Sequence, residues 1–122
     1  MIMQAAETQA VDTQTQVAPL YTSELKNFLD VDGRLKQYPS KYKLKIMALF
    51  YLASKFEPRR RYTEKEVNEV LKQWHTFSDW SMLRRDLYDR EFFNRNIDGS
   101  EYWLEPNQPS PESFDIGLGG SD

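Results

Sequence analysis

Four side chains that can bind an anion or the edge of a base recur along one short stretch of the chain. Ser81, Arg84, Arg85 and Tyr88 follow the i, i+3, i+4, i+7 spacing, which places them on one face of a helix. A guanidinium can bind a phosphate or a guanine through two parallel hydrogen bonds, and hydroxyl groups can add further ones. The stretch is therefore a candidate surface for contacting nucleic acid.

The same arginines have an alternative use within the fold. Acidic residues lie within reach of Arg84 and Arg85 along the predicted helices, namely Glu66, Glu69, Asp86 and Asp89. Ion pairs with these acids would tie the helices together instead of leaving the cations free, and the sequence leaves both uses open. Further cations complete the candidate site, where they would hold the flanking phosphate backbone: Arg59, Arg60, Arg61 and Arg95.

Two helices joined by a short turn are predicted to carry these residues. Thr63 and Glu66 have the spacing of a capping box, which marks a helix start. An apolar face follows at helical spacing, formed by Val67, Val70, Leu71 and Trp74. After a turn over residues 75–78, Ser78 or Asp79 is expected to cap a second helix over about residues 80–89, which buries Trp80, Leu83 and Leu87.

A β-hairpin is expected after the second helix, because two β-prone runs, residues 92–97 and 101–104, flank Asp98 and Gly99. A two-residue loop would pair Arg95 with Tyr102 and Asn94 with Trp103, whereas adding Ser100 to the loop would shift the register. The sequence does not decide between these registers. Tyr62 is expected to be extended and to form a third strand beside the hairpin.

The residues before this stretch are expected to form a platform. Residues 22–29 have the pattern of a short amphipathic helix, and residues 41–56 that of the most apolar helix, with Ser40 as its cap. Three cations crowd the first turns of that helix, where the helix dipole disfavours positive charge: Lys41, Lys43 and Lys45. We interpret them as a solvated face in preference to a phosphate contact.

Composition limits the kind of protein this can be. With 122 residues the chain has room for one domain, and it has no cysteine and one histidine, which argues against disulfides and metal sites. No long apolar run or signal peptide is present, so we expect a cytoplasmic protein without a membrane contact. Residues 1–21 and 105–122 are expected to be disordered tails, the second of them acidic, around a domain at residues 22–104.

Charge is distributed unevenly along the chain. The net charge is -3, but residues 34–104 carry fifteen Lys and Arg against ten Asp and Glu, whereas the segments on either side are acidic. A basic body between acidic ends indicates an anionic partner. A small apolar cluster in the acidic tail, Phe114, Ile116 and Leu118, is interpreted as incidental in preference to a docking motif.

Several blocks resemble the bacterial domain-of-unknown-function family 2087 over residues 34–104, including residues 62–68, 83–87 and 98–103. Members of that family occur alone or fused to ArsR-like winged-helix regulators, and the resemblance implies a transcriptional regulator without implying catalytic residues. Family members often have Gly where Glu91 stands. The predicted fold class is mainly α with a small β-hairpin, a winged helix-turn-helix.

The leading hypothesis is a DNA-binding protein that contacts duplex DNA through its second helix and its hairpin and regulates transcription. The alternative is a protein-interaction module that docks on RNA polymerase, on another regulator or on itself as a homodimer, because Trp and Tyr are enriched in interface hot spots. An enzyme is not expected, since the sequence suggests no nucleophile with a base and no phosphate-binding loop. No cofactor and no metal are expected.

Overall fold

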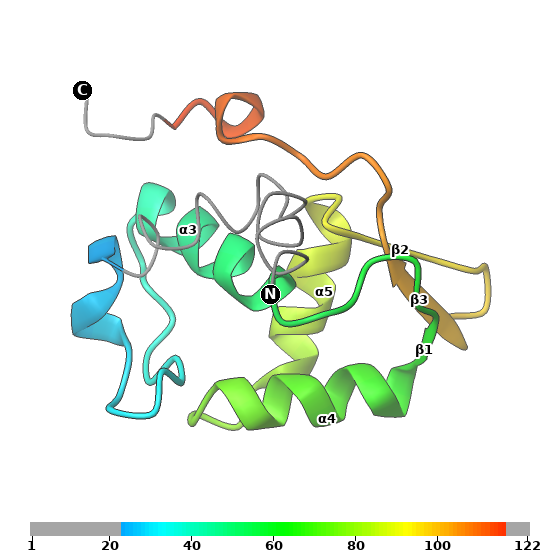
Figure 1. Ribbon diagram of the computed structural model, residues 1–122, viewed down its shortest axis with the longest axis horizontal. Helices are drawn as coiled ribbons and strands as arrows, with labels where there is room; N and C mark the ends of the chain where they lie inside the picture. Colours follow the sequence, from blue (N-terminus) through cyan, green and yellow to red (C-terminus); the bar gives the residue numbers. More distant parts are fainter. Residues whose placement is uncertain (1–22, 117–122) are drawn as a thin grey trace, which may run out of the picture.

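The computed structural model describes residues 23–116 and shows a small domain of mixed α and β structure (Figure 1). Its elements in chain order are η1 (Lys26–Phe28), α3 (Tyr42–Ala53), β1 (Tyr62–Thr63), α4 (Glu64–Trp74), α5 (Trp80–Asp89), β2 (Phe93–Arg95), β3 (Glu101–Leu104) and η2 (Pro111–Phe114). The three α-helices lie on one side of a three-stranded antiparallel sheet (Figure 1). The calls on residues 1–21 and on Leu118 lie outside the described residues.

Helix α3 forms the centre of the core, as its apolar pattern predicted. Every residue from Ile46 to Ala53 is buried, and Phe56 remains buried just beyond the helix end. The predicted cap is wrong, because Lys41 occupies the N-cap position and no side-chain hydrogen bond closes this end. In the described part of the helix expected at residues 22–29, Ser23 and Glu24 are α-helical, and after the fully buried Leu25 the chain continues as the short 3-10 helix η1.

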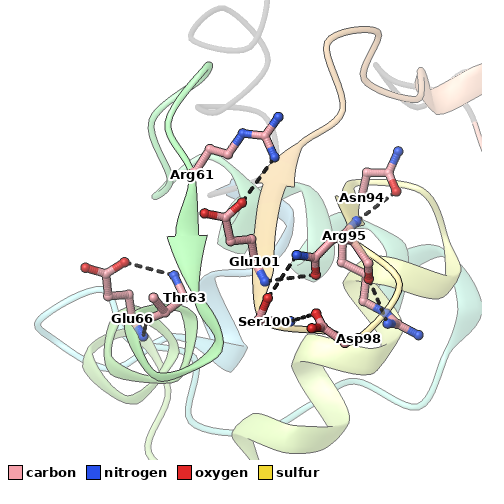
Figure 2. A network of polar contacts seen from close by, with 9 residues as sticks. Arg61, Thr63, Glu66, Asn94, Arg95, Asp98, Ser100 and Glu101 are labelled. Atoms are coloured by element: carbon pink, nitrogen blue, oxygen red, sulfur yellow. Dashed lines mark hydrogen bonds and ion pairs between the residues drawn. The ribbon is translucent and has the colours of Figure 1, made fainter.

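Helices α4 and α5 begin and end close to the predicted positions. The Thr63 hydroxyl accepts the Glu66 backbone N–H at 3.1 Å, and the Glu66 carboxylate accepts the Thr63 N–H at 2.9 Å, which confirms the capping box (Figure 2). His75 organises the turn between the helices: its Nε2 accepts the Asp79 N–H at 2.9 Å, so Nδ1 carries the proton and donates to the Leu71 carbonyl. Asp79 is the N-cap of α5 but makes no side-chain capping bond.

The sheet has the strand order β1-β3-β2, so the predicted third strand is confirmed at Tyr62. Arg95 pairs with Tyr102 and Asn94 with Trp103, the register expected for a two-residue loop. The loop differs from the expected two-residue turn. Of Asp98 and Gly99, only Gly99 has a positive φ, and the Gly99 N–H donates to the Asn96 carbonyl at 3.1 Å. The Asn96 side chain then accepts the backbone N–H of Glu101 at 3.1 Å.

The segment after β3 packs on the domain, so the expectation of a disordered tail is wrong for residues 105–116. This segment crosses above α3 and ends in η2 (Figure 1). The Phe114 ring stacks on Phe92 with centroids 5.6 Å apart, and the buried Ile116 is 6% exposed. Gln108 donates to the Phe92 carbonyl at 2.9 Å. Phe114 and Ile116, which were taken as incidental, therefore pack in or against the core, and Phe114 does so through aromatic partners that only the folded chain assembles.

Candidate nucleic-acid interface

Arg84 links the two helices of the predicted site. Its guanidinium donates to the Asn68 side-chain oxygen and lies 3.4 Å from the Glu64 carboxylate, and its side chain is 17% exposed. Both partners belong to α4. The structural use considered from the sequence is therefore present, although through partners other than the four acids expected for it.

Ser81 and Arg85 lie on the exposed side of α5. Neither side chain forms a hydrogen bond or an ion pair with any residue of the described segment, residues 23–116. The residues that were predicted to share one face of α5 therefore differ in their surroundings. One part, at Arg84, faces α4 and supports the fold, while the other, at Ser81 and Arg85, remains open to a partner.

Arg95 connects the hairpin to α5. Its guanidinium donates to the backbone carbonyls of Asn96 and Ile97 at 3.1 Å each and lies 4.7 Å from the centre of the Tyr88 ring. These contacts stiffen the loop and hold Tyr88 half-buried beneath the arginine. Arg95 and Tyr88 thus lie next to each other, as a shared interface would require. Each of them already has an intramolecular partner.

The three consecutive arginines before β1 have different surroundings. Arg59 is exposed with a φ of 64° and has no ionic partner among residues 23–116. Arg60 lies 3.6 Å from Glu57 and packs over Tyr62 at 4.5 Å. Arg61 lies 3.4 Å from Glu101 (Figure 2) and packs over Trp103 at 4.0 Å. The last contact fixes Arg61 on the outer face of the sheet.

The tip of the hairpin combines an exposed apolar side chain with a carboxylate. Ile97 is 98% exposed there. Hydrogen bonds from Ser100, including its backbone N–H at 3.0 Å, lower the pKa of the neighbouring Asp98 carboxyl below its ordinary value. The Asp98 carboxylate is therefore charged at neutral pH, and the Arg95 guanidinium, which is bonded to the Ile97 carbonyl, provides a cation at the same tip.

A second group of cations and tyrosines lies where α3 begins and α5 ends, and it was not assigned to the site from the sequence. Tyr38 donates to the Asp86 carboxylate at 2.7 Å, and Lys45 lies 5.3 Å from the Tyr38 ring. Arg90 lies 5.8 Å from the ring of Tyr42, which is 48% exposed. The crowding of lysines in the first turns of α3 was the available signal.

Comparison with known protein families identifies the chain's relatives. The model of a family described as "Uncharacterized protein conserved in bacteria (DUF2087)" matches residues 34–104. The chain belongs to this family. No curated protein and no solved structure matches the chain.

The matched range begins before α3 and ends with β3, so it contains every residue of the candidate interface. It does not include the packed segment at residues 105–116. Among the residues that the structure describes, no group of three or more His, Asp or Glu could hold a metal ion. Within the same residues no helix has both the length and the apolar character needed to cross a membrane.

Proposed function

We propose that this DUF2087 domain is a winged helix that binds duplex DNA in the cytoplasm and thereby regulates transcription. The order helix, strand, helix, helix, strand, strand supports the winged helix, as does the position of β3 between β1 and β2. In this arrangement α5 corresponds to the recognition helix and the β2–β3 hairpin to the wing.

The exposed side of α5 is the observation that carries the DNA-binding proposal. Arg85 has no acidic partner among residues 23–116, so it can bind a phosphate or a base without first losing an ion pair. Ser81 lies one helical turn before it and can add a hydrogen bond. Arg84 contributes indirectly, because its bonds to α4 set the position of α5.

The ion pairs of Arg60 and Arg61 are compatible with DNA binding. Both arginines are about half exposed, at 48% and 57%, and their acidic partners lie at 3.6 and 3.4 Å. Exposed pairs of this kind contribute about 0 to 1 kcal/mol. A phosphate can therefore replace the carboxylate at little cost, and these two arginines would hold the backbone beside the sheet.

Fluorescence anisotropy with a labelled duplex, repeated over a range of salt concentrations, tests the proposal. The affinity should fall steeply as salt rises, because phosphate contacts release counterions. Arg85→Ala should weaken binding by about tenfold near 0.1 M salt while leaving the circular dichroism spectrum unchanged. Lys26→Ala, an equal change of charge in η1, is the control. Absence of binding to any duplex at low salt would exclude the proposal.

A protein-interaction module remains the second candidate function. It is favoured by the acidic partners of Arg60, Arg61 and Arg84 and by the exposed Ile97 beside the charged Asp98. RNA polymerase, another regulator or a second copy of the chain would be the partner. A stable complex with a protein, together with no affinity for duplex DNA at low salt, would support this function over the first.

A further inference from the structure

The positive charge of the domain is not neutralised evenly. Around the sheet and α4, the cations Arg60, Arg61, Lys72 and Arg84 each lie within 4 Å of a carboxylate. At the start of α3 and along α5, none of the cations Lys41, Lys45, Arg85 and Arg90 forms an ion pair with a residue of the described chain. Among residues 23–116, four unpaired cations therefore lie on the α3 and α5 side, whereas Arg59 and Lys65 are the unpaired ones around the sheet and α4.

Two tyrosines bring these cations together from the two helices. Lys45 of α3 lies over the Tyr38 ring, and the Tyr38 hydroxyl is bonded to Asp86 of α5. Arg90, which caps the end of α5, lies over the Tyr42 ring of α3. Burial raises the pKa of Tyr38 most and the bond to Asp86 raises it further, whereas the charge of Arg90 acts in the opposite direction.

Acidic residues are present but do not cancel this charge. Asp86 is half-buried and bonded to the Tyr38 hydroxyl, and Asp89 is exposed near the end of α5. With Glu91, which is exposed and directly follows Arg90, the surface has four cations against three carboxylates. No acidic residue occurs in the first turn of α3, so the lysines there gain nothing from a neighbouring carboxylate on their own helix.

We propose that Lys41, Lys45 and Arg90 form, with Arg85, a continuous phosphate-binding surface that extends the duplex contact from α5 onto the start of α3. We call these four residues the α3–α5 cationic surface. This inference rests on the proposed function and specifies which part of the domain meets the DNA backbone. It assigns a binding role to lysines that the sequence alone suggested were merely solvated.

The position of Lys43 provides a matched control on the same helix. At about 100° per residue, Lys41 and Lys45 lie on one side of α3, whereas Lys43 lies roughly on the opposite side. All three lie in or next to the first turns of α3, so replacing any one of them has the same effect on net charge and a similar effect on the helix dipole. Lys43 and Lys45 are both half-buried in the first turns of α3, so the single replacements of these two lysines are matched in charge and differ in the direction of the side chain and in the contact of Lys45 with Tyr38.

The experiment compares three proteins: a double variant that combines Lys41→Gln and Lys45→Gln, the single variant Lys43→Gln, and the wild type. Binding of the full chain to a labelled duplex is measured between low and moderate salt. The double variant should lower the slope of log affinity against log salt by about 2 and reduce affinity near 0.1 M salt by at least tenfold. Lys43→Gln should leave the slope near the wild-type value.

Thermal unfolding separates binding from folding in the same proteins. Removing cations from a helix start does not destabilise the helix, so the double variant should unfold at the wild-type temperature or slightly above it. Weaker binding by an equally stable protein would place the lysines in the interface. If the double variant binds like Lys43→Gln, the α3–α5 cationic surface is refuted while the proposed function stands.

Two further outcomes are decisive. If the wild type binds no duplex at low salt, the proposed function fails and this inference fails with it. Vesicles containing anionic phosphatidylserine serve as a second probe. Loss of vesicle binding in the double variant with unchanged duplex binding would assign the surface to membranes and overturn its assignment to nucleic acid.

Discussion

At the scale of single residues, Glu91 occupies a backbone conformation that suits glycine better. It follows α5 with a φ of 71°, and its N–H donates to the Tyr88 carbonyl at 3.0 Å. The left-handed region costs a residue with a Cβ about 1 to 2 kcal/mol. The turn between α5 and β2 is nevertheless formed with Glu91 in this conformation.

Glu91→Gly should stabilise the protein by roughly 0.5 to 1 kcal/mol, because relief of the backbone strain exceeds the greater entropy of the unfolded chain. Urea denaturation followed by tryptophan fluorescence measures this. Glu69→Gly in the middle of α4 is the control. The helical backbone there gives glycine no advantage, so this substitution should cost about 1 kcal/mol. Equal destabilisation by both changes would show that Glu91 is not strained.

Asp30 makes stability depend on pH. Its carboxylate accepts the backbone N–H groups of Arg34 at 2.8 Å and Asp32 at 2.9 Å, and also the Nε of Arg34 at 3.0 Å. The bond from the Arg34 backbone is the main cause that lowers the pKa of Asp30 below its ordinary value of 3.8. Its stabilising effect is therefore present above about pH 4 and is lost as the pH falls through the lowered pKa.

Asp30→Asn should consequently lower the urea midpoint at pH 7, and the difference from the wild type should shrink as the pH falls below about 4. Denaturation curves at several pH values between 7 and 3 provide the measurement. Asp32→Asn serves as a comparison, because its carboxylate is 4.0 Å from Arg34 and 72% exposed. A difference for Asp30→Asn that stays constant with pH would contradict the assignment.

At the scale of elements, the segment after β3 is held by its aromatic contact. Phe114 stacks on Phe92 and meets Phe50 edge to face with centroids 5.9 Å apart. Phe114→Ala should therefore destabilise the domain by about 2 kcal/mol through lost burial and ring contacts. Glu112→Ala, an exposed change in η2, should have little effect. Equal urea midpoints for the two variants would show that the segment does not support the core.

The elements that sequence patterns predicted well are those determined by local chemistry. The capping box of Thr63 and Glu66 specifies where α4 begins, and Gly99 supplies the positive φ that the hairpin loop requires. The apolar face of α5 predicted the burial of Leu83 and Leu87. Each of these features depends on residues a few positions apart, so the chain itself contains the information.

The features that were missed depend on contacts between distant parts of the chain. Arg84 was expected to pair with Glu66, Glu69, Asp86 or Asp89, yet it bonds to Asn68 and Glu64, because only the packing of α5 on α4 decides which partner lies in reach. Phe114 lies among prolines and acids that indicate a solvated tail, and its partners are 22 and 64 residues away. Spacing in the sequence cannot reveal such pairs.

At the scale of the whole molecule, function depends on how a protein of net charge -3 presents a basic body. Residues 34–104 carry an excess of cations, and residues 1–33 carry one Lys against five acids. Acidic residues covalently linked to a basic surface repel phosphate and compete for that surface. The acidic ends should therefore weaken the proposed DNA binding, and salt should screen this effect.

Neutralising two acids near the N-terminus, Glu7→Gln with Asp12→Asn, should raise duplex affinity at 20 mM salt by roughly threefold, as expected for weak interactions in water. Gln9→Glu with Gln14→Glu should lower it by a similar factor, because the sign of the added charge is reversed. Both effects should disappear near 0.3 M salt, where the screening length is only about 6 Å. Anisotropy titrations of the wild type and both double variants at the two salt concentrations provide the measurement, and equal affinities at 20 mM would show that the acidic end does not compete with DNA.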